Sequence, residues 1–433
     1  MPFSTTQKYR YSPARLECIE DASYNIEKEA ERRKVTLVNI TRLTARNWRN
    51  FRLIDIPISN RLFVVGPNAA GKSNLLDIFR FLSDIASEGG GLHTAVWRRG
   101  GTHRIQSLYA DSYGQEAIEI DVAISDGKDT WRYCLAFEGY AGHIVITKEV
   151  VECNGEIILQ RPNKDDFEDE ILLSQTHLEQ VGFNKKFRNL TNYFASVLYF
   201  HPVPQIIRDP NSVVSGDSQQ YGSTLIEQMI NVSEAIVDQT GMFFARKRLL
   251  EALRAAIPSL DSIDVARDTT GRPHLVMYSR DWAEVPFSYS EDSRASLNEA
   301  ELSDGTLRLI GLLWALITAP DNGLFLLEEP EISLNNAIIR KLPTVLALAQ
   351  RDHNLQTIVS THAPTILDDE GINPDEILVL RPTNQGTRAE LLSQIHEVRG
   401  DISAGLPVSD TVSSLIDPID LANLIAAGGT TSR

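Results

Sequence analysis

The chain is poor in cysteine and in long apolar runs. Its three cysteines, Cys18, Cys134 and Cys153, form no CxxC pair, so neither a zinc site nor a disulfide framework is indicated. No run approaches the length of a membrane span, no signal peptide is recognisable, and no heptad repeat is sustained long enough for a coiled-coil arm. The 433 residues, 42% of them hydrophobic, supply ample material for a core. We therefore expect a large cytoplasmic protein.

Basic residues are outnumbered: 42 Lys and Arg stand against 58 Asp and Glu, which gives a formal net charge of -16. Tight, sequence-independent binding of nucleic acid depends on neutralising phosphates with Lys and Arg, so the composition argues against such binding by the whole surface. Short basic groups remain, and a solvated face is the favoured interpretation of each. These groups are Arg98, Arg99 and Arg104, then Lys185, Lys186 and Arg188, and lastly Arg246, Lys247 and Arg248.

What the chain does have is a glycine-rich loop between an apolar run and a helix-like segment that opens at Asn74. The loop consists of Gly66, Pro67, Asn68, Ala69, Ala70, Gly71, Lys72 and Ser73. It fits the phosphate-loop pattern GxxxxGK[ST] in a strand–loop–helix setting. In that setting backbone N–H groups surround phosphates, Lys72 reaches the terminal phosphates and the Ser73 hydroxyl can bind Mg²⁺. The sequence predicts ATP or GTP binding; the alternative is a glycine-rich turn after a buried strand.

A second candidate anion site precedes the apolar run at 309–317, which is typical of a buried helix. Ser303 would cap that helix, and its hydroxyl, the Gly305 amide and the helix dipole could together hold an anion. The alternative is that Ser303 is only a helix cap.

Two further polar groups follow short apolar segments. Glu328 and Glu329 come directly after Leu324–Leu327, and His362 follows the β-branched segment 357–361. Beside a phosphate loop, one acid can hold Mg²⁺ and the next can polarise water, while the histidine could bond the γ-phosphate or the water. Alone, each could be a solvated turn residue. Four signals in one order make a nucleotide-hydrolysing site the better interpretation.

This order of motifs resembles the ABC-type ATPase domain of the SMC, RecF and OLD group over roughly residues 35–382. The segments Asn47–Phe51, Trp97–Gly101 and Leu302–Arg308 resemble more closely the RecF-like bacterial ATPases predicted from sequence. The resemblance implies an α/β fold, an ABC-type P-loop NTPase head with an antiparallel β-lobe and a helical insertion. It also implies that two heads sandwich two nucleotides.

The resemblance assigns roles within one subunit. Residues 66–74 would bind the nucleotide, with Lys72 on phosphate and Ser73 on Mg²⁺. Glu328 would complete the metal shell through water molecules. Glu329 becomes the candidate general base, and His362 the switch histidine.

Across the dimer, Ser303 and Gly305 would touch the γ-phosphate of the neighbour's ATP. The segment Leu302–Arg308, which we call the signature, has Asp304 and Thr306 where transporters usually carry Gly and Gln, so no transporter is implied. The segment 331–336 lacks the His-Pro that many relatives have after Leu, so the sequence does not identify a dimer-contacting loop there. ABC-type sites also contain a glutamine in a loop of its own, and for this residue Gln115 is favoured over Gln106.

We expect one ATPase head with insertions. Its parts are an N-terminal extension (1–34), a lobe with the phosphate loop (35–116), an inserted β-lobe and helical subdomain (117–300), a lobe with the signature, acids and histidine (301–382), and a tail (383–433). Strand alternation over 117–160 predicts turns at 125–127, 138–139 and 154–155. Helical patterning is expected at 14–34, 225–230, 246–254, 391–398 and 415–427.

The resemblance therefore implies an ATPase that dimerises or oligomerises through its heads and controls a separate effector, such as a Toprim-like nuclease. Prokaryotic anti-phage defence or genome maintenance is the expected setting. An ATP-dependent DNA-repair clamp is the alternative, and a nucleotide-dependent scaffold that hardly turns over is a third. No membrane is expected as a partner.

Overall fold

The computed structural model describes residues 38–109, 116–140, 143–210, 218–234, 240–279 and 296–416. They form two compact units. The larger unit holds the described residues of 36–223 and 302–433, and the smaller holds those of 224–301. The glycine-rich loop, the signature, the acids and His362 all belong to the larger unit. The predicted extension 1–34 and the helix expected at 14–34 lie outside the described residues.

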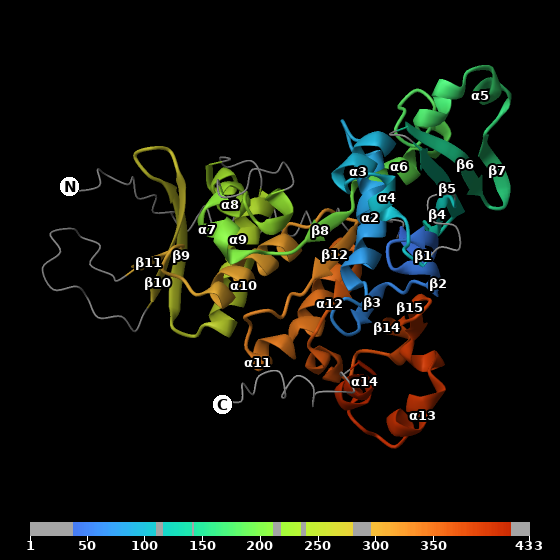
Figure 1. The fold of residues 1–433 in the computed structure, drawn as a ribbon. Helices are drawn as coiled ribbons and strands as arrows, with labels where there is room; N and C mark the ends of the chain where they lie inside the picture. Colours follow the sequence, from blue (N-terminus) through green and yellow to red (C-terminus); the bar gives the residue numbers. More distant parts are fainter. Residues whose placement is uncertain are drawn as a thin grey trace, which may run out of the picture. The chain divides into compact units, whose positions relative to one another are not determined.

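The larger unit is built on a six-stranded sheet with β3 near its middle (Figure 1). Its order is β15 (Gly386–Leu391), β14 (Ile377–Thr383), β3 (Arg61–Val65), β13 (Gln356–Ser360), β12 (Leu324–Glu328) and β8 (Leu198–Phe200). All neighbours are parallel except β14 and β15, which form an antiparallel pair at the edge. Because parallel strands end at the same side, the residues after β3, β12 and β13 meet at one edge of the sheet.

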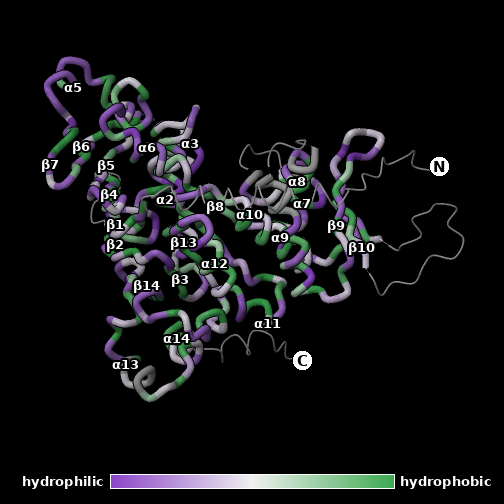
Figure 2. Tube along the Cα trace, turned by 180° about the vertical axis from the view of Figure 1, so that it is seen from behind, coloured by the Kyte–Doolittle hydropathy of each residue, from purple (hydrophilic) through white to green (hydrophobic). Residues whose placement is uncertain are grey.

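The central strands β3, β13 and β12 of this sheet are buried on both faces. Leu62 and Val64 of β3 face one core, which includes helix α2 (Lys72–Ala86). Phe63 and Val65 face the other, which includes residues of α10 (Asp304–Ile317) and α12 (Leu342–His353). This alternation follows from the two-residue period of a strand. Apolar segments therefore run through the centre of the unit in Figure 2.

A second six-stranded sheet is antiparallel throughout. Its order is β2 (Phe51–Pro57), β1 (Asn39–Trp48), β4 (Ile118–Ser125), β5 (Thr130–Tyr140), β6 (His143–Cys153) and β7 (Glu156–Arg161). The β-lobe expected at 117–160 is thus present, and it extends a hairpin that precedes the phosphate loop. The predicted turn at 138–139 is wrong, because β5 continues to Tyr140. Gly139 instead makes room for Thr102, whose Oγ1 would lie 2.1 Å from a Cβ at that position.

Shorter helices complete the larger unit. They are α3 (Leu92–Arg98), α4 (Thr102–Ile105), α5 (Lys164–Glu168), α6 (Arg188–Ala195), α7 (Pro204–Arg208), α11 (Asn336–Ile339), α13 (His396–Ser403) and α14 (Val408–Ile416). The helix predicted at 391–398 is present in two pieces: Leu391 still belongs to β15, Leu392–Gln394 form a short 3-10 helix, and α13 begins at His396. Most of the helix predicted at 415–427 lies outside the described residues.

The smaller unit carries the helical insertion. Helices α8 (Leu225–Glu234) and α9 (Thr240–Ala256) contain the two helical patterns predicted there. Both contact an antiparallel sheet of β11 (Ser296–Asn298), β10 (Pro273–Ser279) and β9 (Leu260–Arg267). The predicted fold class, an α/β P-loop head with an antiparallel β-lobe and a helical insertion, is confirmed. The predicted domain boundaries stay predictions. Across the described ranges, no helix is long and apolar enough to cross a membrane.

Candidate functional site

The glycine-rich loop leaves β3 at Val65 and enters α2 at Lys72. Gly71 has φ +100°, a left-handed backbone that favours glycine. Gly66 lies so close to the neighbouring strand that a Cβ would meet the Leu380 carbonyl oxygen at 2.7 Å. The loop therefore needs both glycines, and it places the free amides of a helix amino terminus at the sheet edge.

Lys72 is 5% exposed and folds back over the loop. Its Nζ donates to the carbonyl oxygens of Gly66 (2.7 Å) and Pro67 (3.1 Å) and lies 3.3 Å from His362 Nδ1. Burial lowers the pKa of Lys72 to about 8, although Glu329, Glu331 and Glu328 oppose the shift. The ammonium group is thus held by weak neutral acceptors that phosphate oxygens could replace.

Ser73 and Glu328 lie in direct contact. The Ser73 hydroxyl donates to one carboxylate oxygen of Glu328, and the Tyr199 hydroxyl donates to the other. Tyr199 reaches this point because β8 is the neighbour of β12. A hydroxyl and a carboxylate are ligands that Mg²⁺ accepts, with phosphate and water completing its shell, so the pair fits that ion. Sequence reasoning missed Tyr199, because no motif marks it.

Glu329 and His362 follow adjacent strands and contact each other. His362 Nε2 lies 2.8 Å from Glu329 Oε1, so the imidazole lies between this carboxylate and Lys72. Glu329 has φ +46°, an unusual backbone for a residue with a side chain, and such conformations cost about 1–3 kcal/mol and cluster at functional sites. The arrangement can hold a water molecule next to a base at the edge of a phosphate site.

Two buried charges beside this pair have unused hydrogen-bonding atoms. Arg308, on α10, is 8% exposed, and its Nε and Nη1 have no hydrogen-bond partner within the described structure. Glu331 accepts from the His362 amide (2.6 Å) through one oxygen, but its other oxygen has no partner there. Burial lowers the pKa of Arg308 and raises that of Glu331. Arg308 ends the segment Leu302–Arg308 that was identified from the sequence, but the sequence predicted no role for its side chain.

Ser303 is the cap of α10, as the sequence predicted. Its Oγ accepts from the Thr306 amide at 3.2 Å. Gly305 packs against the segment after the acids, where a Cβ would meet the Ser333 carbonyl oxygen at 2.3 Å. Among the described residues, neither bonds to the phosphate loop of the same chain. The Asn74 side chain, counted with the loop, donates to Asn50 at 2.8 Å.

The glutamine expected at Gln115 lies outside the described residues. Gln106, the other candidate, is buried and donates to the Glu116 carbonyl oxygen at 3.3 Å. A histidine also lies near the acids: at the carboxyl end of β8, His201 Nδ1 lies 3.1 Å from the Glu328 carbonyl oxygen. His201 is a second neighbour of the acids that sequence reasoning missed.

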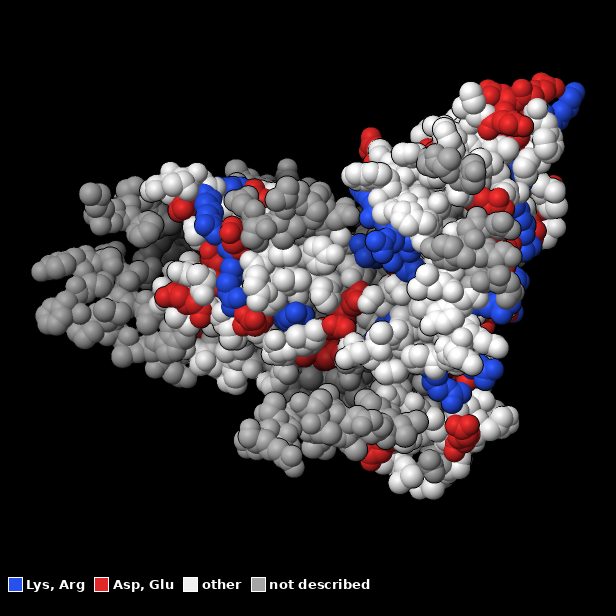
Figure 3. Space-filling model, in the orientation of Figure 1, with Lys and Arg blue, Asp and Glu red and all other residues white. Residues whose placement is uncertain are grey.

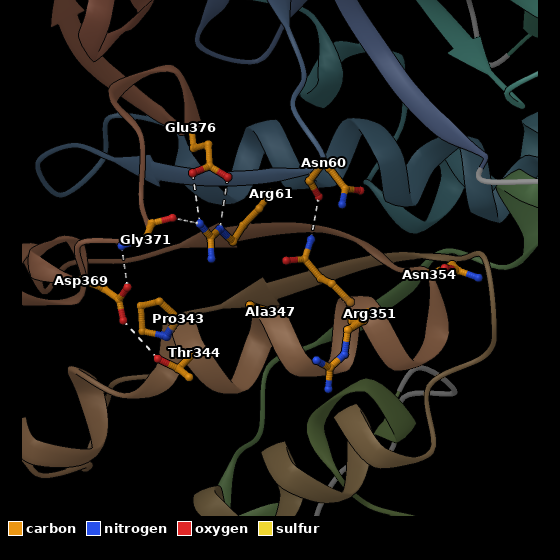
Figure 4. Close-up of a pocket in the computed structure, with 11 residues that line it drawn as sticks. Asn60, Arg61, Pro343, Thr344, Ala347, Arg351, Asn354, Asp369, Gly371 and Glu376 are labelled. Carbon is orange, nitrogen blue, oxygen red and sulfur yellow. Dashed lines mark hydrogen bonds and ion pairs between the residues drawn. The ribbon is translucent and has the colours of Figure 1, made fainter. Parts of the chain in front are cut away.

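A pocket of about 600 Å³ lies at the opposite, amino-terminal end of the strands, and Figure 4 shows the residues that line it. Asn60 and Arg61 line it at the start of β3, and Arg61 is already held by Glu376 (3.0 Å) and by the Gly371 carbonyl oxygen. No predicted site residue lines this pocket, so it is separate from the candidate site at the other end of the strands.

Comparison with solved structures returns SMC heads. One is described as the SmcHead bound to the C-winged helix domain of ScpA (13% identity, 81% of this chain and 96% of that chain, TM-score 0.44). Others are the SMC head domain from Thermotoga maritima (13%, 82% and 98%, 0.40) and the Pyrococcus furiosus Smc head with an extended coiled coil bound to the C-terminal domain of ScpA (12%, 85% and 100%, 0.45). At such scores the likeness carries no argument about function.

No curated protein matches the chain. A family model does match, over residues 62–368, a span that begins in β3 and ends beyond His362. That span contains the glycine-rich loop, the signature, the acids and the histidine in their predicted order. The chain accordingly belongs to the family described as AAA domain, putative AbiEii toxin, Type IV TA system, and it is a P-loop ATPase of the AAA/ABC type.

Proposed function

We propose that the protein binds ATP with Mg²⁺, hydrolyses it, and uses a dimer of heads to control a partner protein. The observation that carries this proposal is the meeting of four side chains at the carboxyl ends of β3, β12 and β13. Lys72, Glu328, Glu329 and His362 come from three separate segments and contact one another or Ser73. Measurement of ATP binding and phosphate release by the purified chain tests it.

In this proposal, Lys72 exchanges the carbonyls of Gly66 and Pro67 for the β- and γ-phosphates, which are stronger acceptors. Ser73 and Glu328 would hold Mg²⁺, and that ion would supply neutralisation of charge on the transferred phosphate. Glu329 accepts a proton from the attacking water, and His362, 2.8 Å away, orients that carboxylate.

The sandwich dimer is supported by the state of the signature. Ser303 is exposed at the amino end of α10, where N–H groups and the helix dipole favour an anion. Since it makes no bond to its own phosphate loop, we propose that it and Gly305 bind the γ-phosphate on the neighbouring head. The family description, which names a putative toxin of a toxin–antitoxin system, favours a role in defence. We propose a separately encoded effector, such as a Toprim-like nuclease, as the partner.

The alternative, an ATP-dependent DNA clamp, needs uncompensated cations. Arg99 is paired with Asp77 (2.8 Å) and Asp84 (2.7 Å), and Arg98 is paired with Asp84 (2.6 Å). On the face shown in Figure 3, Lys and Arg form small groups among acidic and uncharged residues. DNA binding measured against salt, with and without ATP, separates the two: a steep slope supports the clamp, and no binding supports the effector-controlling head.

We expect Ser303→Arg to leave the subunit folded and to block closure over the neighbour's ATP. A cap contributes only about 1 kcal/mol to folding, whereas a large cation would occupy the site. Mixed with Lys72→Ala subunits, it should regain part of the ATPase rate, because one composite site then holds both defects and the other neither. Full activity of Ser303→Arg alone would rule out the sandwich mechanism.

Affinity for ATP should fall as the pH rises above about 8. In the protein without nucleotide, Lys72 has a pKa of about 8. Bound phosphate would raise that pKa because it favours the charged ammonium group. Affinity is therefore full below the free pKa and falls by up to about tenfold per pH unit above it, until the bound pKa is reached. Titrations from about pH 7.5 to about pH 9.5 measure this, and Lys72→Arg, which keeps its charge, should remove the dependence. A flat profile for the wild type would contradict it.

A further inference from the structure

The carbonyl oxygen of Ala70, in the phosphate loop, accepts two side-chain hydrogen bonds. Asn50 Nδ2 donates to it at 2.7 Å, and Thr387 Oγ1 donates at 2.9 Å. Asn50 lies in the tight turn between β1 and β2, and Thr387 lies in β15, so the donors come from two different sheets. Thr387 is 6% exposed. The loop is therefore fastened from outside at one peptide group.

The two donors are themselves held in place. Asn50 Nδ2 also donates to Thr387 Oγ1 at 2.6 Å, and Asn50 Oδ1 accepts from Asn74 Nδ2 at 2.8 Å. The Thr387 backbone amide donates to the Asn50 carbonyl oxygen at 2.8 Å. Because both protons and the oxygen of the Asn50 amide are used, its orientation is set by several bonds at once.

Fixing the Ala70 carbonyl also fixes the next N–H group. The C=O of Ala70 and the N–H of Gly71 belong to one planar trans peptide and point in opposite directions. Glycine can adopt many backbone conformations, so this peptide could otherwise turn over and direct its carbonyl oxygen at the phosphates. Gly71 must also stay small, since a Cβ there would lie 2.1 Å from Asn50 Nδ2.

We propose that Asn50 and Thr387 are positioning residues that keep the Gly71 N–H directed at the bound phosphates. This rests on the proposed function, because it requires the loop to hold a nucleotide. The two side chains anchor the outer side of the peptide, and the inner side is left with a donor that needs no rearrangement when the anion arrives.

The double variant Asn50→Ala/Thr387→Val should bind ATP about tenfold to a hundredfold more weakly, the effect expected for one lost hydrogen bond to a charged group. The losses of binding free energy in the two single variants should not add up to the loss in the double variant, because both donors act on one carbonyl. Thr387→Ser keeps the hydroxyl and should bind like the wild type, whereas Thr387→Val should not. Thr383→Val is the matched control: it removes a hydroxyl from the same hairpin, one that donates to Gly386 rather than to the loop.

The thermal unfolding temperature of each of these variants is also measured in the absence of nucleotide. We expect the Thr387→Val and Thr383→Val proteins to unfold at similar temperatures while only the former loses affinity. Wild-type affinity in the double variant, equal loss in Thr387→Ser and Thr387→Val, or equal loss in Thr383→Val would each overturn the proposal. If the wild type binds ATP and Lys72→Ala does not, these outcomes refute the positioning role alone. If the wild type fails to bind ATP, the proposed function falls with it.

Discussion

Glu329→Gln should stop ATP hydrolysis while ATP and Mg²⁺ stay bound. The amide has the size of the carboxylate and can still accept from His362, which lies 2.8 Å from Glu329. It cannot take a proton from water, and loss of a general base typically costs about a hundredfold to ten-thousandfold in rate. Steady-state phosphate release and equilibrium binding of labelled ATP, measured on the same preparation, give the two halves of this result.

Glu328→Gln is the matched control, since it makes the same change one residue earlier. Glu328 contacts Ser73 and Tyr199, so its amide variant should weaken the Mg²⁺-dependent part of ATP binding. Binding with excess chelator should be the same for the two variants. A Glu329→Gln protein with the wild-type hydrolysis rate would show that the base lies elsewhere.

Lys72→Ala should remove most of the affinity for ATP. Lys72 is buried beside the loop, and phosphates would be its charged partners. Truncating one member of a buried, hydrogen-bonded charge pair costs about 2–5 kcal/mol, which is roughly thirtyfold to several thousandfold in dissociation constant. Equilibrium titration with labelled ATP at about pH 7, below the pKa of Lys72, measures it.

Lys164→Ala provides the control for the loss of a positive charge. Lys164 lies on α5 with its side chain 90% exposed, 3.9 Å from Glu168, and such exposed pairs contribute little. This variant should bind ATP like the wild type. If Lys72→Ala also did so, the assignment of the phosphate loop would be wrong.

Short-range patterns carried the sequence predictions that the fold bears out. The loop before α2, the apolar strand before Glu328 and the buried helix after Ser303 each depend on neighbours within a few residues. The parallel sheet then brings Lys72, Glu328, Glu329 and His362 together, although their roles stay predictions. Periodicity and motif order can reveal such residues, because each motif is complete within one segment.

Other site neighbours could not be predicted in this way. Tyr199 and Thr387 acquire their partners through strand pairing between distant segments, and no local motif marks them. The error at Leu391 has the same origin: pairing with β14 overrides its local helical pattern. The sequence predicts a turn at Gly139, because it does not show that Thr102, on α4, packs against this position and leaves no room for a side chain.

The placement of β3 has a consequence for the order in which the protein is made. β3 pairs with β13 and β14, and the Ala70 carbonyl accepts from Thr387, which is 317 positions away. The hairpins β1–β2 and β5–β6, by contrast, join segments that are close in the chain and can form early. Synthesis proceeds from the amino terminus. A nascent chain therefore contains the complete GPNAAGKS segment long before β13 and β14, the strands that pair with β3, have been made. Nucleotide can stabilise the finished head, but it cannot act as a template for the first steps of its folding.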